Sequence, residues 1–379
     1  MVSIINAVAI LAFALCPDNI MFSFAGEHKI ISAKGFLLYI SFVGAFILGT
    51  FCLRGKKLSP VQLSSGDTKL LRCFGLLFFC LSICGYLLWF GDLAQDPTYV
   101  KILFTRGTYA TRPLLEEKMI PGFTTLTQFA IAGVTCLSIT FFKTRQKKDT
   151  IFIVILIGMS LLRMFFFGER LAFIELVVPF FFVKLRFEPW ESKKIAFLGL
   201  TLFIVAWSTE LLRSFFVYSK TYEPAQFLFY RLIMYFSTSL NNFMLIVHSN
   251  FPVDLFPITL KALYKQLGYA PESQTLYHYL LETKLNLEYN NKSGWGAIFF
   301  EFGYAGIVVS LGLGMLSKLI YNKYKQGVMD GLLFYPLFLL FFYQSYRILF
   351  LNDSRIFYPL GGLLLIVLIK PIVLKRKVL

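Results

Sequence analysis

The residues of this sequence best suited to chemistry are arginines that lie in or beside long apolar segments. Arginine keeps its charge at any physiological pH, and its planar guanidinium group matches the oxygens of a phosphate. Charge beside a membrane helix is costly unless it is used, so a set of such arginines predicts a site for a ligand with two phosphates. For any single arginine, an equally good alternative is an ion pair, such as Arg170 with Glu169, or a side chain that reaches to the membrane surface. The set comprises Arg106, Arg112, Arg163, Arg170, Arg213, Arg231, Arg347 and Arg355.

Two of these arginines have the most informative surroundings. The sequence Gly168-Glu169-Arg170 forms a tight turn between two short apolar segments, so Arg170 is expected at the mouth of a span. Arg231 lies within the amphipathic apolar stretch 225–247. We therefore rank these two arginines first as ligands of a phosphate group.

One acidic residue is placed where it could accept a proton. Glu301 lies in the apolar run 298–309, and an ionisable group inside a membrane segment is a functional candidate by default. The alternative for Glu301 is a buried structural ion pair with an arginine. Glu169 is the second candidate.

A short polar and aromatic stretch precedes this acid. Asn290, Asn291 and Trp295 lie close together, and amide groups with an aromatic ring suit sugar recognition. Alternatively, Ser293 caps a helix and Trp295 lies at the membrane surface. The three histidines have no metal-ligand spacing and there is no Asp-x-Asp pair, so we expect neither a metal nor a cofactor.

The elements that carry these residues are membrane helices. The chain has 379 residues, of which 57% are hydrophobic and 15% charged, against about 45–50% and about 25% in soluble domains. The mean hydropathy of +0.68 and apolar runs long enough to cross ~30 Å of hydrocarbon exclude a soluble enzyme, a nucleic-acid-binding module and a disordered tail. The net charge of +16 then reflects basic cytoplasmic loops in a multi-pass protein of the lipid bilayer.

The apolar runs predict ten spans in a single integral membrane domain, 1–379. Five connecting segments hold 20 Lys and Arg in 53 residues, whereas the opposite-side segments hold 14 in 134. This bias places both termini in the cytoplasm and the long loops outside. The predicted spans are 3–23, 35–53, 73–90, 121–142, 150–167, 171–184, 195–213, 296–317, 332–347 and 356–371.

The stretch 225–247 is apolar enough to span, but crossing would reverse the basic segments that follow it. It would also bury Arg231, Asn241 and Asn242 at membrane depth. We therefore predict an interfacial or re-entrant helix within one large external loop, 214–295. A loop of this length must carry structure of its own.

The segment from Asn291 to Gly306 resembles the start of a late span in bacterial O-antigen polymerases of the Wzy type. There, a polar stretch leads into an aromatic–acid–Phe–Gly run and a second glycine; Glu301 stands where an aspartate is common. Gly168-Glu169-Arg170 resembles that family's turn between two mid-chain spans, and 235–242 resembles its Tyr- and Ser-rich segment. The likeness covers most of the chain in layout and some 40 residues in motif.

The resemblance implies an all-α bundle similar to lipid-linked (GT-C-like) glycosyltransferases in the bacterial inner membrane. It implies a metal-independent polymerase that transfers a growing glycan from undecaprenyl pyrophosphate to a lipid-linked repeat unit in the periplasm, with inversion. It assigns Arg170 and Arg231, then Arg106 and Arg355, to the pyrophosphate, and Glu301 or Glu169 to the base. Arg112 and Arg347 are expected to be further substrate contacts, and the expected sugar contacts are Asn290, Asn291 and Trp295. A chain-length regulator is expected as a further partner.

Two alternative functions remain open at this point. An O-antigen ligase would use the same donor with a lipid A–core acceptor. A flippase or transporter of the lipid-linked oligosaccharide predicts internal symmetry and broken helices, instead of a large external loop. No internal repeat is visible in the sequence, which favours an enzyme.

Overall fold

The computed structural model describes residues 2–26, 28–106, 122–167, 169–218, 222–249, 293–348 and 354–375, together with residues 264, 267 and 268. Helices dominate this part of the chain, and its only strand-type pairing is an isolated parallel bridge between Gln62 and Val328.

Six helical segments in the described part of the chain are long and apolar enough to cross a membrane. They confirm that the protein is an all-helical, polytopic membrane protein. The helices α1 (Val2–Leu15) and α16 (Met329–Gln344) are apolar but shorter. The six segments are Ala33–Cys52, Ser65–Gly91, Thr124–Thr144, Lys147–Phe167, Gly294–Gln326 and Arg355–Val373.

These six segments match six of the ten predicted spans, and the other four predicted spans are helical too. Of those four, α9 (Arg170–Phe187) contains four charged residues and an internal proline, and α10 (Ser192–Tyr218) extends beyond its predicted limits. The prediction of one span over 3–23 is wrong in one respect, because α1 ends at Leu15 and Pro17 precedes a separate helix, α2 (Asp18–Ala25). Proline cannot donate the backbone hydrogen bond that would continue α1. The count of ten spans stays a prediction.

The chain forms two compact units, each built from three stretches. Unit 1 comprises residues 1–56, 228–322 and 338–357. Unit 2 comprises residues 57–227, 323–337 and 358–379.

In unit 1, α3 (Ala33–Cys52) and α15 (Gly306–Gln326) pack backbone against backbone. A Cβ atom at Gly49 would overlap the carbonyl of Leu311, and one at Gly314 would overlap the carbonyl of Phe46. The ring of Phe42 lies against Gly306. Gly306 and Gly314 of α15 therefore let α3 approach at very short range, as glycines at membrane helix contacts do.

The predicted span 296–317 is not one regular helix. It begins as α14 (Gly294–Phe302), passes through one turn of 3₁₀ helix, η3 (Gly303–Ala305), and continues as α15. Gly303 has φ 54°, a conformation that glycine adopts without the strain of a Cβ atom. A discontinuous helix is a feature expected of the transporter alternative, although here the break is a single short turn.

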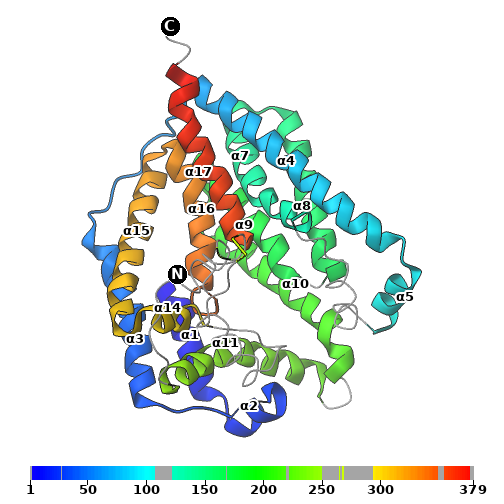
Figure 1. Ribbon diagram of the computed structural model, residues 1–379, viewed down its shortest axis with the longest axis vertical. Coiled ribbons are helices and arrows are strands. Elements are labelled where there is room, and N and C mark those ends of the chain that lie inside the picture. Colours follow the sequence, from blue (N-terminus) through cyan, green and yellow to red (C-terminus); the bar gives the residue numbers. More distant parts are fainter. Residues whose placement is uncertain are drawn as a thin grey trace. The chain divides into compact units, whose positions relative to one another are not determined.

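Unit 2 is built around α7 (Phe129–Thr144), whose residues are almost all buried. The helices α4 (Ser65–Ala94), α8 (Lys147–Phe167) and α9 all pack against α7 (Figure 1). Glycines permit this packing, since Gly75 of α4 lies against Leu137 and Gly133 of α7 lies against Leu156. The short helix η1 (Thr124–Gln128) leads into α7 beside α4.

Basic residues of unit 2 link the ends of several of its helices. Arg72 Nη2 lies 2.8 Å from Asp149 Oδ1, and Lys370 Nζ lies 2.8 Å from Asp67 Oδ1. Arg186 Nε donates to the carbonyl of Tyr324 at 2.9 Å. The segments that the charge bias assigns to the cytoplasm thus contact one another, as segments on one side of a membrane should.

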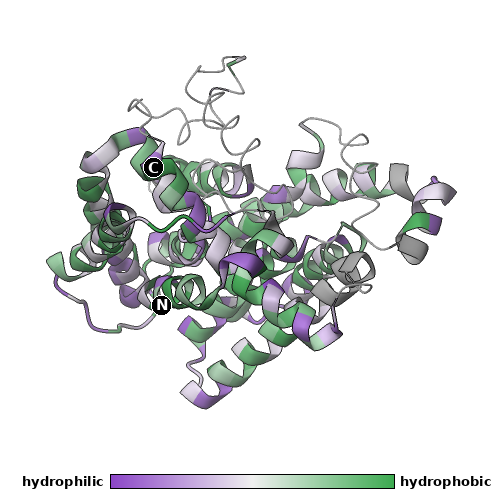
Figure 2. Ribbon diagram, turned by 90° about the horizontal axis from the view of Figure 1, so that it is seen from below, coloured by the Kyte–Doolittle hydropathy of each residue, from purple (hydrophilic) through white to green (hydrophobic). Residues whose placement is uncertain are grey.

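Large apolar side chains remain exposed along the helices, for example Phe51, Ile151, Phe197 and Leu368. Figure 2 shows apolar residues along many of the helices. Exposed apolar surface of this extent is unfavourable in water and favourable against lipid tails. This surface fits a protein embedded in a membrane.

Candidate functional site

The helix α11 (Pro224–His248) carries several buried polar residues of unit 1. Pro224 occupies its first turn, where a missing backbone N–H costs nothing. Arg231, Thr238 and Asn242 follow at spacings of seven and four residues, so they share one face of the helix. Arg231 is only 2% exposed, and Thr238 and Asn242 are fully buried. A charged group therefore lies in the interior of unit 1.

Arg347, in the turn that follows α16, contacts this face of α11. Tyr235 lies one turn from Arg231 on the same side of α11, and the Arg347 guanidinium carbon lies 4.6 Å from the centre of the Tyr235 ring. The adjacent rings of Phe236 and Tyr346 are stacked, with centroids 5.2 Å apart. Two of the predicted phosphate ligands, Arg231 and Arg347, thus belong to one neighbourhood of unit 1.

The position of α11 is fixed by α3 and α14. Phe243 of α11 contacts Tyr39 and Phe42 of α3 and Phe299 of α14. Figure 1 shows α11 running across the end of α3, not alongside it. This arrangement suits a helix outside the spanning set, and α11 is absent from the six apolar segments found in the described residues. Whether α11 is interfacial or re-entrant stays a prediction.

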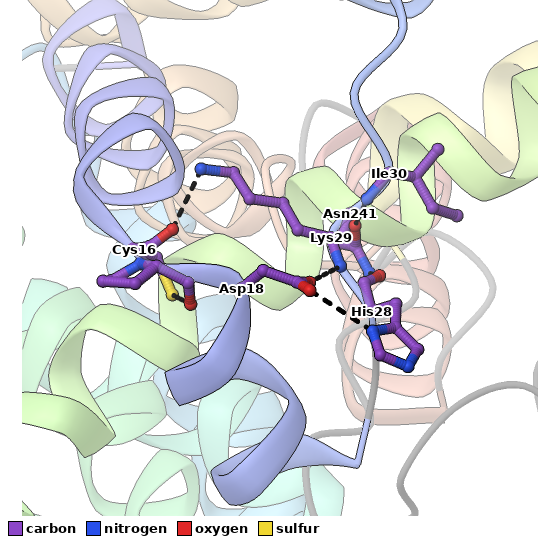
Figure 3. Close-up of polar contacts among 7 residues, drawn as sticks. Cys16, Asp18, His28, Lys29, Ile30 and Asn241 are labelled. Carbon is purple, nitrogen blue, oxygen red and sulfur yellow. Dashed lines mark hydrogen bonds and ion pairs between the residues drawn. The ribbon is translucent and has the colours of Figure 1, made fainter.

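A polar network ties α11 to the connection between α2 and α3 (Figure 3). Asn241 Oδ1 accepts from the backbone N–H of Ile30 at 2.8 Å, and Asn241 Nδ2 donates to the carbonyl of His28 at 3.1 Å. Asp18 Oδ1 accepts from the backbone N–H of Lys29 at 2.6 Å. This backbone hydrogen bond, together with His28, lowers the pKa of Asp18. The Lys29 ammonium group donates to the carbonyl of Cys16 at 2.9 Å, close to the end of α1.

Glu301 is fully buried in the last turn of α14. It shares a face with Ala297 and Gly294, four and seven residues before it. Gly294 lies directly against the carbonyls of Ser345 and Ile348, the residues that flank Tyr346 and Arg347. At 1.5 Å of rise per residue, Glu301 is about 10 Å along α14 from this contact.

Trp295 does not lie where a sugar platform or an interfacial anchor would. It is 1% exposed, its ring packs near Phe42 and Phe46, and its Nε1 donates to Asn6 Oδ1 at 2.9 Å. The geometry corrects both expectations for Trp295. The expected helix cap is confirmed, because Ser293 Oγ accepts from the backbone N–H of Gly296.

In unit 2, Glu169 and Arg170 each contact a residue that the sequence had not linked to them. The Glu169 carboxylate is paired with Arg163, whose Nη2 lies 2.5 Å from Glu169 Oε2. Arg170, the first residue of α9, has its guanidinium carbon 5.7 Å from the centre of the Trp207 ring. It remains half-buried.

The remaining candidates lie at the ends of helices or outside the described residues. Arg355 is half-buried in the first turn of α17 (Ser354–Lys375) in unit 1. Arg106 ends α5 (Pro97–Arg106) in unit 2, and its side chain lies outside the described part of the chain. Arg112, Asn290 and Asn291 lie outside the described residues altogether.

Within the described ranges, no three His, Cys, Asp or Glu side chains group together as metal ligands would. Sequence reasoning assigned no role to Asn6 or to the Arg163–Glu169 pair, because their partners come from other elements. In the sequence, Asn241 mattered only because its burial at membrane depth would be costly. In the structure, its amide group accepts a hydrogen bond from the backbone of Ile30 and donates one to the backbone of His28.

No protein-family model, no curated protein and no solved structure matches this chain.

Proposed function

We propose that the protein is an O-antigen polymerase of the bacterial inner membrane. It transfers a growing glycan from undecaprenyl pyrophosphate to a lipid-linked repeat unit on the periplasmic side, without a metal ion. The sequence resemblance described above is one support for this proposal, and the polar interior of unit 1 is the other.

The observation that carries the proposal is that the buried Arg231 and the half-buried Arg347 belong to the surroundings of one residue, Tyr235. Arg231 lies one turn from Tyr235 on α11, and Arg347 covers the Tyr235 ring at 4.6 Å. A guanidinium group held in an interior that excludes water stabilises phosphate charge far more than one in bulk solvent. Arg231 is buried and Arg347 is half-buried, and a pair of guanidinium groups suits a pyrophosphate, the leaving group of the proposed reaction.

The proposed reaction needs an acceptor hydroxyl, a leaving group and a proton acceptor. The acceptor oxygen attacks the anomeric carbon of the donor glycan, and the bond from that carbon to the pyrophosphate oxygen breaks. The negative charge passes to undecaprenyl pyrophosphate, where Arg231 and Arg347 stabilise it. Glu301 takes the proton of the acceptor hydroxyl, a contribution of roughly 10²–10⁴-fold where a base operates.

A lipopolysaccharide gel of a strain lacking the gene tests this function. We expect core carrying a single repeat unit, because flipping and ligation continue without the polymerase, and a full ladder when the wild-type gene returns. Loss of every O-antigen band would instead identify a ligase or a flippase. An unchanged ladder would contradict any required role in polymerisation.

A further inference from the structure

The last residue of α16 carries a buried amide group, the side chain of Gln344. Gln344 is 6% exposed, and its Oε1 is enclosed without a hydrogen bond to any residue that the structure describes. Buried polar side-chain atoms are nearly always hydrogen-bonded, so an exception calls for an explanation. Ser310 is also buried without a partner among the described residues, but a serine hydroxyl can rotate to a carbonyl of its own helix. An amide group has no such local partner.

The backbone around Gln344 is held on two sides. The Gln344 carbonyl accepts from the N–H groups of Arg347 at 2.8 Å and of Ile348 at 2.9 Å, so the chain coils for one more turn beyond α16. Gly294 of α14 lies directly against the carbonyls of Ser345 and Ile348. Residues three apart in such a coil have Cβ atoms about 5–6 Å from one another. The Gln344 amide is therefore a neighbour of the Arg347 guanidinium group.

Tyr343 brings an aromatic ring next to this amide. The ring packs, together with Tyr235, against the buried cluster of Ile5, Ala9 and Tyr346, and it remains half-buried. A tyrosine presents an apolar ring and a polar tip, and an amide group both donates and accepts. Sugars need this combination, because their ring hydrogens pack on aromatic faces while their hydroxyl groups both donate and accept hydrogen bonds.

We propose that Gln344 and Tyr343 form the subsite for the sugar that is bonded to the donor pyrophosphate. The inference rests on the proposed function, in which Arg347 stabilises that pyrophosphate. The spacing of one turn between Arg347 and Gln344 matches the width of one sugar ring. Sugar recognition then lies in the turn at the end of α16, and not at Trp295, whose indole group is bonded to Asn6.

The test compares two ligands of the full-length protein in lipid nanodiscs. One is undecaprenyl pyrophosphate, and the other is the same lipid carrying only the first sugar of the repeat unit. We expect wild type to bind the sugar-bearing lipid about tenfold more tightly, as two additional hydrogen-bonding side chains would provide. Gln344→Met, which keeps the length of the side chain but lacks the amide, should lose most of this preference while binding the sugar-free lipid as wild type does.

Two further variants define the subsite. Tyr343→Phe, which removes only the hydroxyl group, should lose part of the preference. Ser310→Ala removes another buried group without a partner among the described residues and is the matched control. It should bind both lipids as wild type does.

Thermal unfolding without ligand separates a binding role of Gln344 from a structural one. Because burial of an amide oxygen without a partner is unfavourable, Gln344→Met should unfold at the wild-type midpoint or above it. A lower midpoint would show that the amide stabilises the fold, and it would overturn the inference.

The two ligands also distinguish failure of this inference from failure of the proposed function. Equal binding of both lipids by wild type, or a preference that survives in Gln344→Met, would overturn the subsite and leave the pyrophosphate site intact. Binding of neither lipid by wild type would overturn the proposed function, and the subsite with it.

Discussion

Trp295 and Asn6 are joined by a hydrogen bond of 2.9 Å, although 289 residues separate them in the chain. Asn6 Oδ1 also accepts from the hydroxyl group of Tyr39 at 2.6 Å. One amide oxygen therefore connects α1, α3 and α14 inside unit 1. In a membrane interior there is no water to replace such a partner.

Replacing Asn6 by Leu should destabilise unit 1. The indole N–H of Trp295 and the hydroxyl of Tyr39 would lose their acceptor, at a cost of about 1–3 kcal/mol for each buried group. The midpoint of thermal unfolding in detergent should fall clearly. Ser41→Ala, which removes an exposed hydroxyl from α3, is the matched control and should leave the midpoint unchanged. Equal midpoints for the two variants would contradict the role given to Asn6.

Replacing Gly314 by Ala should separate α3 from α15. The added methyl group would overlap the carbonyl of Phe46, and backbone cannot give way as a flexible side chain can. Gly312→Ala provides the control on the same helix, because no atom lies near its Cβ position; it should be neutral or slightly stabilising, by up to about 1 kcal/mol. The yield of monodisperse protein after detergent extraction distinguishes the two. Similar yields would mean that α3 and α15 are not in close contact.

Replacing Arg72 by Met should cost more stability than replacing Arg72 and Asp149 together by Met and Leu. The single change leaves the fully buried Asp149 carboxylate without its cation, although Thr140 Oγ1 still donates to it at 3.2 Å. Removing one partner of a buried pair costs about 3–5 kcal/mol, and the 30% exposure of Arg72 places this case at the lower end. Chemical unfolding of the three proteins measures the difference. A double variant as unstable as Arg72→Met would show that the pair itself matters little.

Acid should weaken the attachment of the connection between α2 and α3. The pKa of Asp18 is lowered in the folded protein, chiefly by the backbone N–H of Lys29. A lowered carboxyl pKa contributes stability above the unfolded value of about 4, and that contribution disappears as pH falls through the folded value. The unfolding midpoint of wild type should therefore fall by more than that of Asp18→Asn as the pH is lowered below about 4. Parallel curves would contradict this account of Asp18.

Much of the helical layout follows from the sequence, because apolar runs of span length form membrane helices with little help from neighbours. The interruption at Pro17 was visible as a break in the first run. The 3₁₀ turn at Gly303 was not, because a lone glycine in an apolar run does not reveal whether its φ is positive.

The candidate site was less predictable, because its contacts join residues far apart in the sequence. The sequence placed Arg231 in an apolar stretch but did not predict its burial, and the position of Arg347 over Tyr235 depends on how α11 meets the end of α16. Glu169 and Arg170 are adjacent in sequence, whereas the observed partner of Glu169 lies six residues back across the turn. Trp295 gave the same signal as an interfacial tryptophan, and only the contact with Asn6 distinguishes the two.

In the proposed function, Arg231 binds the donor pyrophosphate of a glycan polymerase. The most direct measurement uses purified protein in lipid vesicles with undecaprenyl-pyrophosphate-linked repeat units and a metal chelator. Wild type should build a ladder of polymer. Arg231→Lys, which keeps the charge but loses the planar fork, should build at least tenfold less at a comparable unfolding midpoint, and Arg145→Ala, far from α11 in the sequence and exposed, should match wild type. An undiminished ladder from both Arg231→Lys and Arg231→Ala would contradict the binding of the donor pyrophosphate by Arg231.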